Sequence, residues 1–177
     1  VEWNSFMNLT AITEFDQVIT KHFLDSLSLV KVCDVAQAGR ILDVGTGAGF
    51  PGIPLKIAFP EVEVVLLDSL NKRVKFLNEV IGQLGLSKIT AIHGRAEDFA
   101  RQKEYREQFD LVVSRAVANL SSLSEYCLPY VKVGGRFVSY KSGKLSEELT
   151  AAQKAIHVLG GEAKEPVYFQ LTGTEDE

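Results

Sequence analysis

The residues best suited to chemistry lie in the stretch RILDVGTGAGFPGIPL, residues 40–55. Its apolar start contains Asp43 and leads into a glycine loop, residues 45–49, with glycine at the first, third and fifth positions. Glycines spaced this closely let backbone N–H groups approach a ligand without side chains in the way. The next apolar run ends in Asp68, whose carboxylate could accept hydrogen bonds from the ribose hydroxyls of an adenine nucleoside. The same carboxylate could instead cap a following helix, so both roles stay open.

Two ligands fit a glycine loop followed by an acidic residue, NAD and S-adenosylmethionine. The sequence favours S-adenosylmethionine, because Phe50 and Pro51 stand where a dinucleotide-binding loop needs a helix start that faces a pyrophosphate. A carboxylate at Asp43 would repel a phosphate, whereas it could receive the ammonium group of a methionine moiety. The cofactor contacts expected in this region are Asp43, Gly45, Thr46, Gly47, Gly49, Phe50 and Asp68.

A second motif, GRAEDF at residues 94–99, offers a place for the adenine ring. The side chain of Glu97 or Asp98 could accept a hydrogen bond from the adenine amino group, while backbone amides meet ring nitrogens. The same letters are typical of the start of a short helix, so the residues alone leave both interpretations open.

The methyl acceptor should face the segment VVSRAVANL, residues 112–120. This segment is not the Asn-Pro-Pro-Tyr motif that holds an exocyclic amino group, and the sequence has no Pro-Cys pair to attack a pyrimidine carbon. It contributes Arg115 instead, and Lys141 ends the next expected strand. Two cations suit an acceptor such as guanine N7, which has a lone pair and no proton to remove and therefore needs positioning rather than a base. The alternative is that both residues form ordinary ion pairs.

The elements that must position these residues alternate between strand and helix. We expect strands at residues 40–44, 62–67, 89–93, 109–114, 135–140 and 167–171, and helices at 18–30, 53–59, 71–84, 120–130 and 146–159. Strands that are apolar throughout and separated by helices predict a mostly parallel sheet with helices on both faces, an α/β Rossmann-like fold. We expect one domain over residues 1–177, with a helical part at 1–38 and a sheet core at 39–177.

The composition indicates an ordinary cytoplasmic protein. The chain has 177 residues, 46% of them hydrophobic, and a formal net charge of -4, which argues against a protein that coats nucleic acid non-specifically. Cys33 and Cys127 are its two cysteines, and their wide separation indicates neither a disulfide framework nor a metal site. No apolar run approaches the roughly 20 residues that span a bilayer, and we expect no membrane association and a monomer.

Seven stretches together resemble the bacterial glucose-inhibited division protein B family. They are WNSFMNLTAITE, KHFLDSL, ILDVGTGAGFPGIPL, LLDSLNKRVKFL, GRAEDF, SRAVANL and YKSG, spread over nearly the whole chain. The resemblance implies a methyltransferase that uses S-adenosylmethionine to modify N7 of a guanine in small-subunit (16S) ribosomal RNA, without a metal. It also implies that the substrate is read within the small ribosomal subunit or as free RNA.

The resemblance assigns roles to individual residues. Gly45 and Phe50 are similar to the family's cofactor-loop contacts, Ala96 and Glu97 to its adenine contacts, and Arg115 to the arginine between cofactor and substrate. Residues similar to those around the RNA entrance are Lys72, Arg95, Lys141, Asn8, His22, Asp25 and Ser26. For His22 the residues favour a hydrogen-bonded structural histidine. We expect Arg115 and Lys141 to position the base and its backbone.

The chain also departs from the family pattern at both ends. Family members usually have a further helical segment before VEWN and a hydrophobic strand after the acidic residues at the end, so we expect a chain that is truncated at both ends. If the acceptor is RNA, Arg95, Arg115 and Lys141 should form one basic patch. Scattered cations would favour a methyltransferase for a small molecule or protein. The third alternative is a nucleotide-binding domain without this activity.

Overall fold

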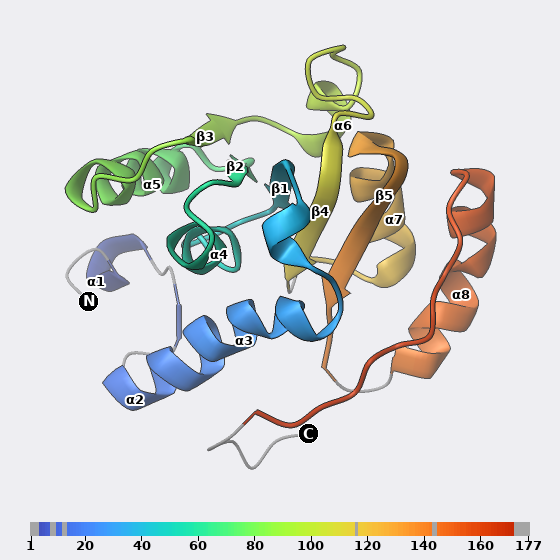
Figure 1. Ribbon diagram of the computed structural model, residues 1–177, viewed down its shortest axis with the longest axis horizontal. Helices are drawn as coiled ribbons and strands as arrows, with labels where there is room; N and C mark the ends of the chain where they lie inside the picture. Colours follow the sequence, from blue (N-terminus) through green and yellow to red (C-terminus); the bar gives the residue numbers. More distant parts are fainter. Residues whose placement is uncertain (1–3, 8–9, 12–13, 116, 143–144, 172–177) are drawn as a thin grey trace.

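A five-stranded parallel sheet forms the centre of the molecule (Figure 1). The computed structural model describes residues 4–7, 10–11, 14–115, 117–142 and 145–171. The strands are β1 (Arg40–Val44), β2 (Glu63–Asp68), β3 (Ile89–His93), β4 (Phe109–Arg115) and β5 (Val131–Tyr140), in the order β3-β2-β1-β4-β5. The strand order reverses direction at β1, and ligands of such sheets bind beyond the carboxyl ends of the strands at that point. The expected α/β fold is confirmed.

Side chains of each strand alternate between two apolar layers because successive residues point to opposite faces. Ile41 of β1 packs with residues of α4 (Gly52–Ala58) and α5 (Asn71–Gln83), whereas Leu42 packs with residues next to or within α6 (Ala96–Phe99), α7 (Leu120–Cys127) and η4 (Leu128–Tyr130). The last helix, α8 (Leu145–Val158), covers α7 from outside through Ala152 and Ile156 (Figure 1). Burial of both faces explains why the strands are apolar throughout.

Short helical elements precede β1. They are α1 (Asn4–Met7), α2 (Phe15–Val18), η1 (Ile19–Leu24), α3 (Asp25–Leu27), η2 (Ser28–Lys31) and η3 (Val35–Gln37). Since η1 is a π-helix, it has more residues per turn than an α-helix and rotates the face that follows it. The apolar face expected from an α-helix at 18–30 is therefore only partly buried. Phe23 and Leu24 are exposed, and Leu29 takes the buried position instead.

Most expected strand and helix positions are confirmed, but two regions differ. β5 begins at Val131 rather than at residue 135, and its pairing with β4 shifts between Phe109 and Leu111. The strand expected at 167–171 is wrong, since the structure gives residues 161–171 no regular element. This segment runs beside α8, where Val167 and Tyr168 face solvent and find no strand to pair with among the described residues (Figure 1). Among the helices that the structure describes, none has the length and apolar character needed to cross a membrane.

Candidate functional site

The glycine loop connects β1 to α4 at the carboxyl end of the sheet. The N–H groups of Gly45 and Thr46 donate to the Leu67 carbonyl of β2, at 2.8 and 3.1 Å. Gly45 and Gly47 have φ values of 70° and 61°, a left-handed conformation that favours glycine. A Cβ atom on Gly47 would meet nothing within 4 Å. The backbone at Gly47 is therefore bare on its outer side, as a loop that receives a ligand requires.

Asp43 lies beneath this loop and holds it in shape. Its side chain is fully buried, and Oδ2 accepts hydrogen bonds from the Thr46 hydroxyl at 2.7 Å and from the Gly52 N–H at 2.8 Å. Burial raises the pKa of Asp43 to about 6. Asp43 and Thr46 were expected at the cofactor surface, but both are buried. The turn into α4 places them inside, where the Thr46 hydroxyl and the Gly52 N–H donate to Asp43. Oδ1 of Asp43 is also buried and has no hydrogen-bond partner among the described residues.

Asp68 ends β2 directly beside the glycine loop. Its Oδ2 accepts the Gly47 N–H at 2.9 Å, and its Oδ1 accepts the Leu70 N–H at 2.9 Å, just before α5. Arg73 lies 3.5 Å from the same Oδ2. The carboxylate therefore does organise the start of a helix, which was one of its two expected roles. Oδ2 therefore has two donors, whereas Oδ1 has one and keeps lone-pair capacity for a further donor.

The expected adenine contacts lie at the start of α6. The carbonyl of Ala96 accepts a hydrogen bond from the hydroxyl of the buried Tyr130, which fixes the position of this short helix. The Glu97 carboxylate accepts from Arg95 at 3.0 Å, and both side chains reach solvent. A backbone hydrogen bond lowers the pKa of Glu97 below its usual range. Partial burial opposes this shift, and the neighbouring Arg95 adds to it. Glu97 is therefore ionised at neutral pH and can accept a hydrogen bond.

Arg115 ends β4 and ties the N-terminal helices to the glycine loop. One guanidinium nitrogen, Nη1, donates to Asp25 Oδ2 at 2.7 Å and to the Lys21 carbonyl at 3.1 Å. The other, Nη2, lies 3.0 Å from His22 Nδ1, and the guanidinium carbon lies 5.4 Å from the centre of the Phe50 ring. The side chain is only 16% exposed. Arg115 thus connects three parts of the chain at the mouth of the loop.

His22 completes this cluster. Its ring stacks on Phe50 with centroids 4.7 Å apart, and its Nε2 lies 2.7 Å from the Thr10 hydroxyl. Because arginine can only donate, Nδ1 must accept, and the neutral ring therefore carries its proton on Nε2. Burial, and next the Arg115 charge, lower the pKa of His22. Both ring nitrogens are used in hydrogen bonds, which agrees with the structural histidine that the residues favoured.

Lys141 follows β5, and its ammonium group is held inside the protein. Nζ donates to the Ala118 carbonyl and to Glu148 Oε2, each at 2.7 Å, and the side chain is 15% exposed. Its alternative role as an ion-pair residue is therefore what the structure shows. Glu148 in the first turn of α8 had no expected role, and the only signal in the sequence was an acidic residue near a helix start.

The remaining expected RNA contacts are scattered. Ser26 is fully buried and donates to the His22 carbonyl, because it lies on the inner side of α3, so it cannot contact RNA. Lys72 and Arg95 are exposed on α5 and before α6, and Asn8 lies outside the described residues. The expected patch of Arg95, Arg115 and Lys141 is wrong: three strand positions separate the ends of β3 and β4, and the last two side chains are mostly buried.

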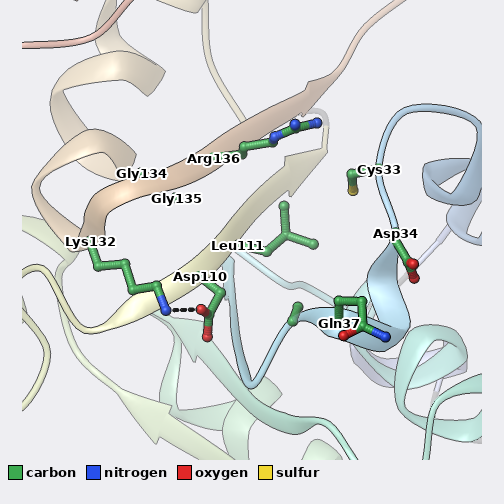
Figure 2. Close-up of a pocket in the computed structure, with 10 residues that line it drawn as sticks. Cys33, Asp34, Gln37, Asp110, Leu111, Lys132, Gly134, Gly135 and Arg136 are labelled. Carbon is green, nitrogen blue, oxygen red and sulfur yellow. Dashed lines mark ion pairs between the residues drawn. The ribbon is translucent and has the colours of Figure 1, made fainter.

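A separate cavity of about 280 Å³ opens at the amino ends of the strands (Figure 2). It lies between η3 and the starts of β4 and β5, where Lys132 forms an ion pair with Asp110. Cys33, Asp34 and Arg136 complete its charged and polar lining (Figure 2). The cavity is thus at the opposite end of the sheet from the glycine loop.

The chain matches the family model of GidB, described as rRNA small subunit methyltransferase G, over residues 1–173. It is 62% identical to ribosomal RNA small subunit methyltransferase G of Lachnoclostridium phytofermentans over 177 residues, which cover 100% of this chain and 73% of that protein. The enzyme of the same name from Clostridium tetani is 55% identical over 170 residues, 96% of this chain and 71% of that protein.

Solved structures of other methyltransferases share the fold. An S-adenosylmethionine-dependent O-methyltransferase from Thermotoga maritima superimposes with a TM-score of 0.60 at 19% identity, covering 89% of this chain and 56% of that one. Coclaurine N-methyltransferase, bound to N-methylheliamine and S-adenosylhomocysteine, gives 0.56 at 13% identity, covering 73% and 38%. At such low identity these likenesses establish a Rossmann-like methyltransferase fold alone. The family match and the close relatives together show that the chain belongs to the GidB family of rRNA small subunit methyltransferase G.

Proposed function

We propose that this chain transfers a methyl group from S-adenosylmethionine to N7 of a guanine in 16S ribosomal RNA. The single observation that carries the proposal is the bare backbone of Gly47 beside Asp68, at the switch point of a methyltransferase sheet. The relatives that share more than half of their residues with this chain are named for the small-subunit RNA. Their name supports the substrate class, and the atom on guanine is our proposal.

The residues around the loop fit the cofactor. The open side of Gly47 offers room for a ribose, and Oδ1 of Asp68 keeps a lone pair that could accept from one of its hydroxyls. Gly45 and Phe50 adjoin this opening, and Ala96 and Glu97 would meet the adenine. Gly49, which was also expected to contact the cofactor, is buried, because a Cβ atom on it would meet Ile53 and Leu77 of the core. The buried Oδ1 of Asp43 has no donor among the residues that the structure describes, and an ammonium group that reached it would supply one. When bound, the cofactor supplies a methyl group on a positively charged sulfur.

Transfer to guanine N7 does not require a general base at the site. Guanine N7 carries an in-plane lone pair and no proton, so direct attack on a methyl carbon requires orientation and no proton removal. Arg115, His22 and Phe50 form a rigid cluster next to the loop, and we assign them to that orientation. Arg115 acts there through the helix that it fixes, since Asp25 and Lys21 use one of its two terminal nitrogens.

RNA binding is assigned to the exposed groups that border this mouth. Lys72 and Arg95 flank the adenine side and suit phosphate contacts, which position RNA without reading its bases. Because the exposed cations are dispersed and the chain is acidic, we propose modest affinity with strong dependence on salt. We further propose that the enzyme acts as a cytoplasmic monomer on a surface preformed in the small ribosomal subunit.

The decisive experiment is transfer of labelled methyl from S-adenosylmethionine to 16S RNA from cells that lack this modification. The reaction is run on free RNA and on assembled small subunits, and the labelled nucleotide is mapped by mass spectrometry. We expect label at N7 of one guanine, and faster transfer to assembled small subunits than to free RNA. Label on another atom, or no label although the protein binds S-adenosylmethionine, would overturn the proposed acceptor.

A further inference from the structure

Glu148 joins the start of one helix to the end of the sheet. Its Oε2 accepts the Lys141 ammonium at 2.7 Å and the backbone N–H of Leu120 at 3.0 Å. Leu120 is the first residue of α7, Glu148 is in the first turn of α8, and Lys141 directly follows β5. One carboxylate oxygen therefore holds three elements together. The Lys141 hydrogen bond keeps the pKa of Glu148 below its usual range, so the carboxylate is charged at neutral pH.

The same group fixes the residues between β4 and α7. Lys141 also donates to the Ala118 carbonyl at 2.7 Å, two residues before the N–H that Glu148 accepts. Asn119 between them caps α7, since its side chain accepts the Ser122 N–H at 3.0 Å. We call Lys141 and Glu148 the bracket. The backbone at 118–120 is thus anchored on both sides of its N-cap residue.

The anchored residues reach the glycine loop through Val117. A Cβ atom on Gly45 would lie 2.6 Å from Val117 Cγ2, so this methyl group lies directly against the Gly45 backbone. No group larger than the Gly45 hydrogen fits between them. Arg115 with its contacts to His22 and Asp25 lies two positions earlier in the chain. A change in the position of residues 117–120 would therefore affect both the glycine loop at Gly45 and the cluster around Arg115.

We propose that Glu148 is a positioning residue for methyl transfer, acting with Lys141 to set Val117 against the glycine loop. This inference rests on the proposed function only in that the loop binds the methyl donor. In this proposal the Lys141 ammonium group pairs with Glu148 inside the protein and does not contact an RNA phosphate. The pair differs from an exposed ion pair, because a lysine that is 15% exposed has lost most of its water and needs its acceptors.

The test measures donor binding and transfer separately. The variants are Lys141→Met, Glu148→Ala, Glu148→Gln, Lys141→Arg and the double variant Lys141→Met with Glu148→Ala. For each, calorimetry gives the dissociation constant of S-adenosylmethionine, single-turnover assays on 16S RNA give the transfer rate, and thermal melting gives stability. The control is Glu61→Gln, whose carboxylate pairs with Lys88 at the same 2.7 Å but on the exposed surface before β2 and β3.

We expect Lys141→Met and Glu148→Ala each to weaken donor binding by about 10-fold, as the loss of one charged hydrogen bond would. The double variant should be no weaker than either single variant, because the two residues act as one unit. Lys141→Arg can still donate to both acceptors, so its dissociation constant for S-adenosylmethionine should stay within about 3-fold of that of the parent. Glu61→Gln should leave donor binding and transfer unchanged.

Two results would overturn the proposal. If Lys141→Met binds S-adenosylmethionine normally but loses transfer to RNA, the lysine contacts the substrate and the bracket has no positioning role. If melting falls while donor binding and transfer per folded molecule stay normal, the bracket only stabilises the fold. Glu148→Gln, which keeps an acceptor and the side-chain shape, provides this comparison if Glu148→Ala fails to fold. Donor binding needs no acceptor, so failure of the guanine assignment would be seen separately.

Discussion

The two ends of the same parallel sheet are built in opposite ways. At the amino end, one carboxylate beside the cavity of Figure 2 has its partners: Asp110 accepts the Arg40 N–H at 2.9 Å and pairs with Lys132. At the carboxyl end, the backbone of Gly47 is bare and Asp43 Oδ1 lacks a donor. The cavity is at the first end, whereas the unsatisfied groups are at the second.

The comparison shows which feature indicates a ligand. The Asp110 carboxylate beside the cavity already has a cationic partner in Lys132, so it does not need one from a ligand. A loop with left-handed glycines and a buried acceptor without a donor is energetically costly in the empty protein. A ligand that supplies a donor there would offset part of this cost. We therefore place function at the carboxyl end, where the strand order also reverses.

The largest effect should come from two matched glycine substitutions. Gly45 and Gly134 both have left-handed backbones, with φ values of 70° and 82°, but a Cβ on Gly45 meets Val117 whereas one on Gly134 meets nothing within 4 Å. Gly45→Val should weaken S-adenosylmethionine binding about 1,000-fold through strain and displacement of Val117. Gly134→Val should cost about 1–2 kcal/mol of stability and leave binding unchanged. Calorimetry below both melting temperatures checks this, and equal loss of binding in the two variants would end the contrast between the two ends.

The next largest effect concerns an arginine at each end. Arg115→Ala should lower single-turnover transfer to 16S RNA about 100-fold, because the helix carrying Asp25 and His22 loses its anchor beside Phe50. Arg136→Ala at the amino end should not change transfer, since its guanidinium is exposed and its bond to the Val32 carbonyl is long, at 3.4 Å. Near-normal transfer by Arg115→Ala would remove its assigned role.

The sequence was informative where local pattern decides structure. The alternation of apolar strands and helices placed β1 and β3 at their observed bounds, and the spacing of Gly45, Gly47 and Asp68 located the switch point. Both signals depend on residues close together in the chain, so a pattern is enough to read them. The same holds for α5, which ends before Gly85 with its left-handed backbone.

Partners far apart in the chain could not be read in this way. Whether Arg115 and Lys141 point to solvent depends on Asp25 and Glu148, which fold against them from other elements. Ser26 was placed at the RNA entrance by the family resemblance, whereas the fold buries its side chain on the inner side of α3. The sequence therefore placed the glycine loop correctly at the switch point of the sheet, but it assigned exposure to two cations that the fold mostly buries.

A smaller effect should distinguish two aspartates whose side chains each accept a backbone N–H. Asp68 accepts the Gly47 N–H and Asp110 accepts the Arg40 N–H, both at 2.9 Å. Asp68→Asn keeps one acceptor but loses charge and lone pairs for a ribose, so we expect about 10-fold weaker binding of S-adenosylmethionine. Asp110→Asn should alter thermal stability only. Unchanged donor affinity in Asp68→Asn would leave this carboxylate with its helix-capping role alone.

The smallest effect is the pH dependence of the His22 cluster. The pKa of His22 in the folded chain lies below its usual 6.5, so as the pH falls the unfolded chain takes up the proton first. His22 therefore stabilises the fold fully above about pH 6.5, and this contribution is lost as the pH falls through the lowered folded pKa. We expect the free energy of unfolding to decrease over this range.

The groups that face His22 determine the control. Arg115 disfavours its protonated form, Asp25 favours it, and the Thr10 hydroxyl accepts from Nε2 of the neutral ring. Asp43 behaves in the opposite way, since its raised pKa of about 6 means that its contribution is lost as the pH rises from 3.8. Urea unfolding of the parent and of His22→Gln between pH 4 and 8 separates the two, because only the difference between the curves belongs to His22. Parallel curves would show that the ring takes up its proton equally in both states, and would leave Arg115 held by Asp25 and the Lys21 carbonyl alone.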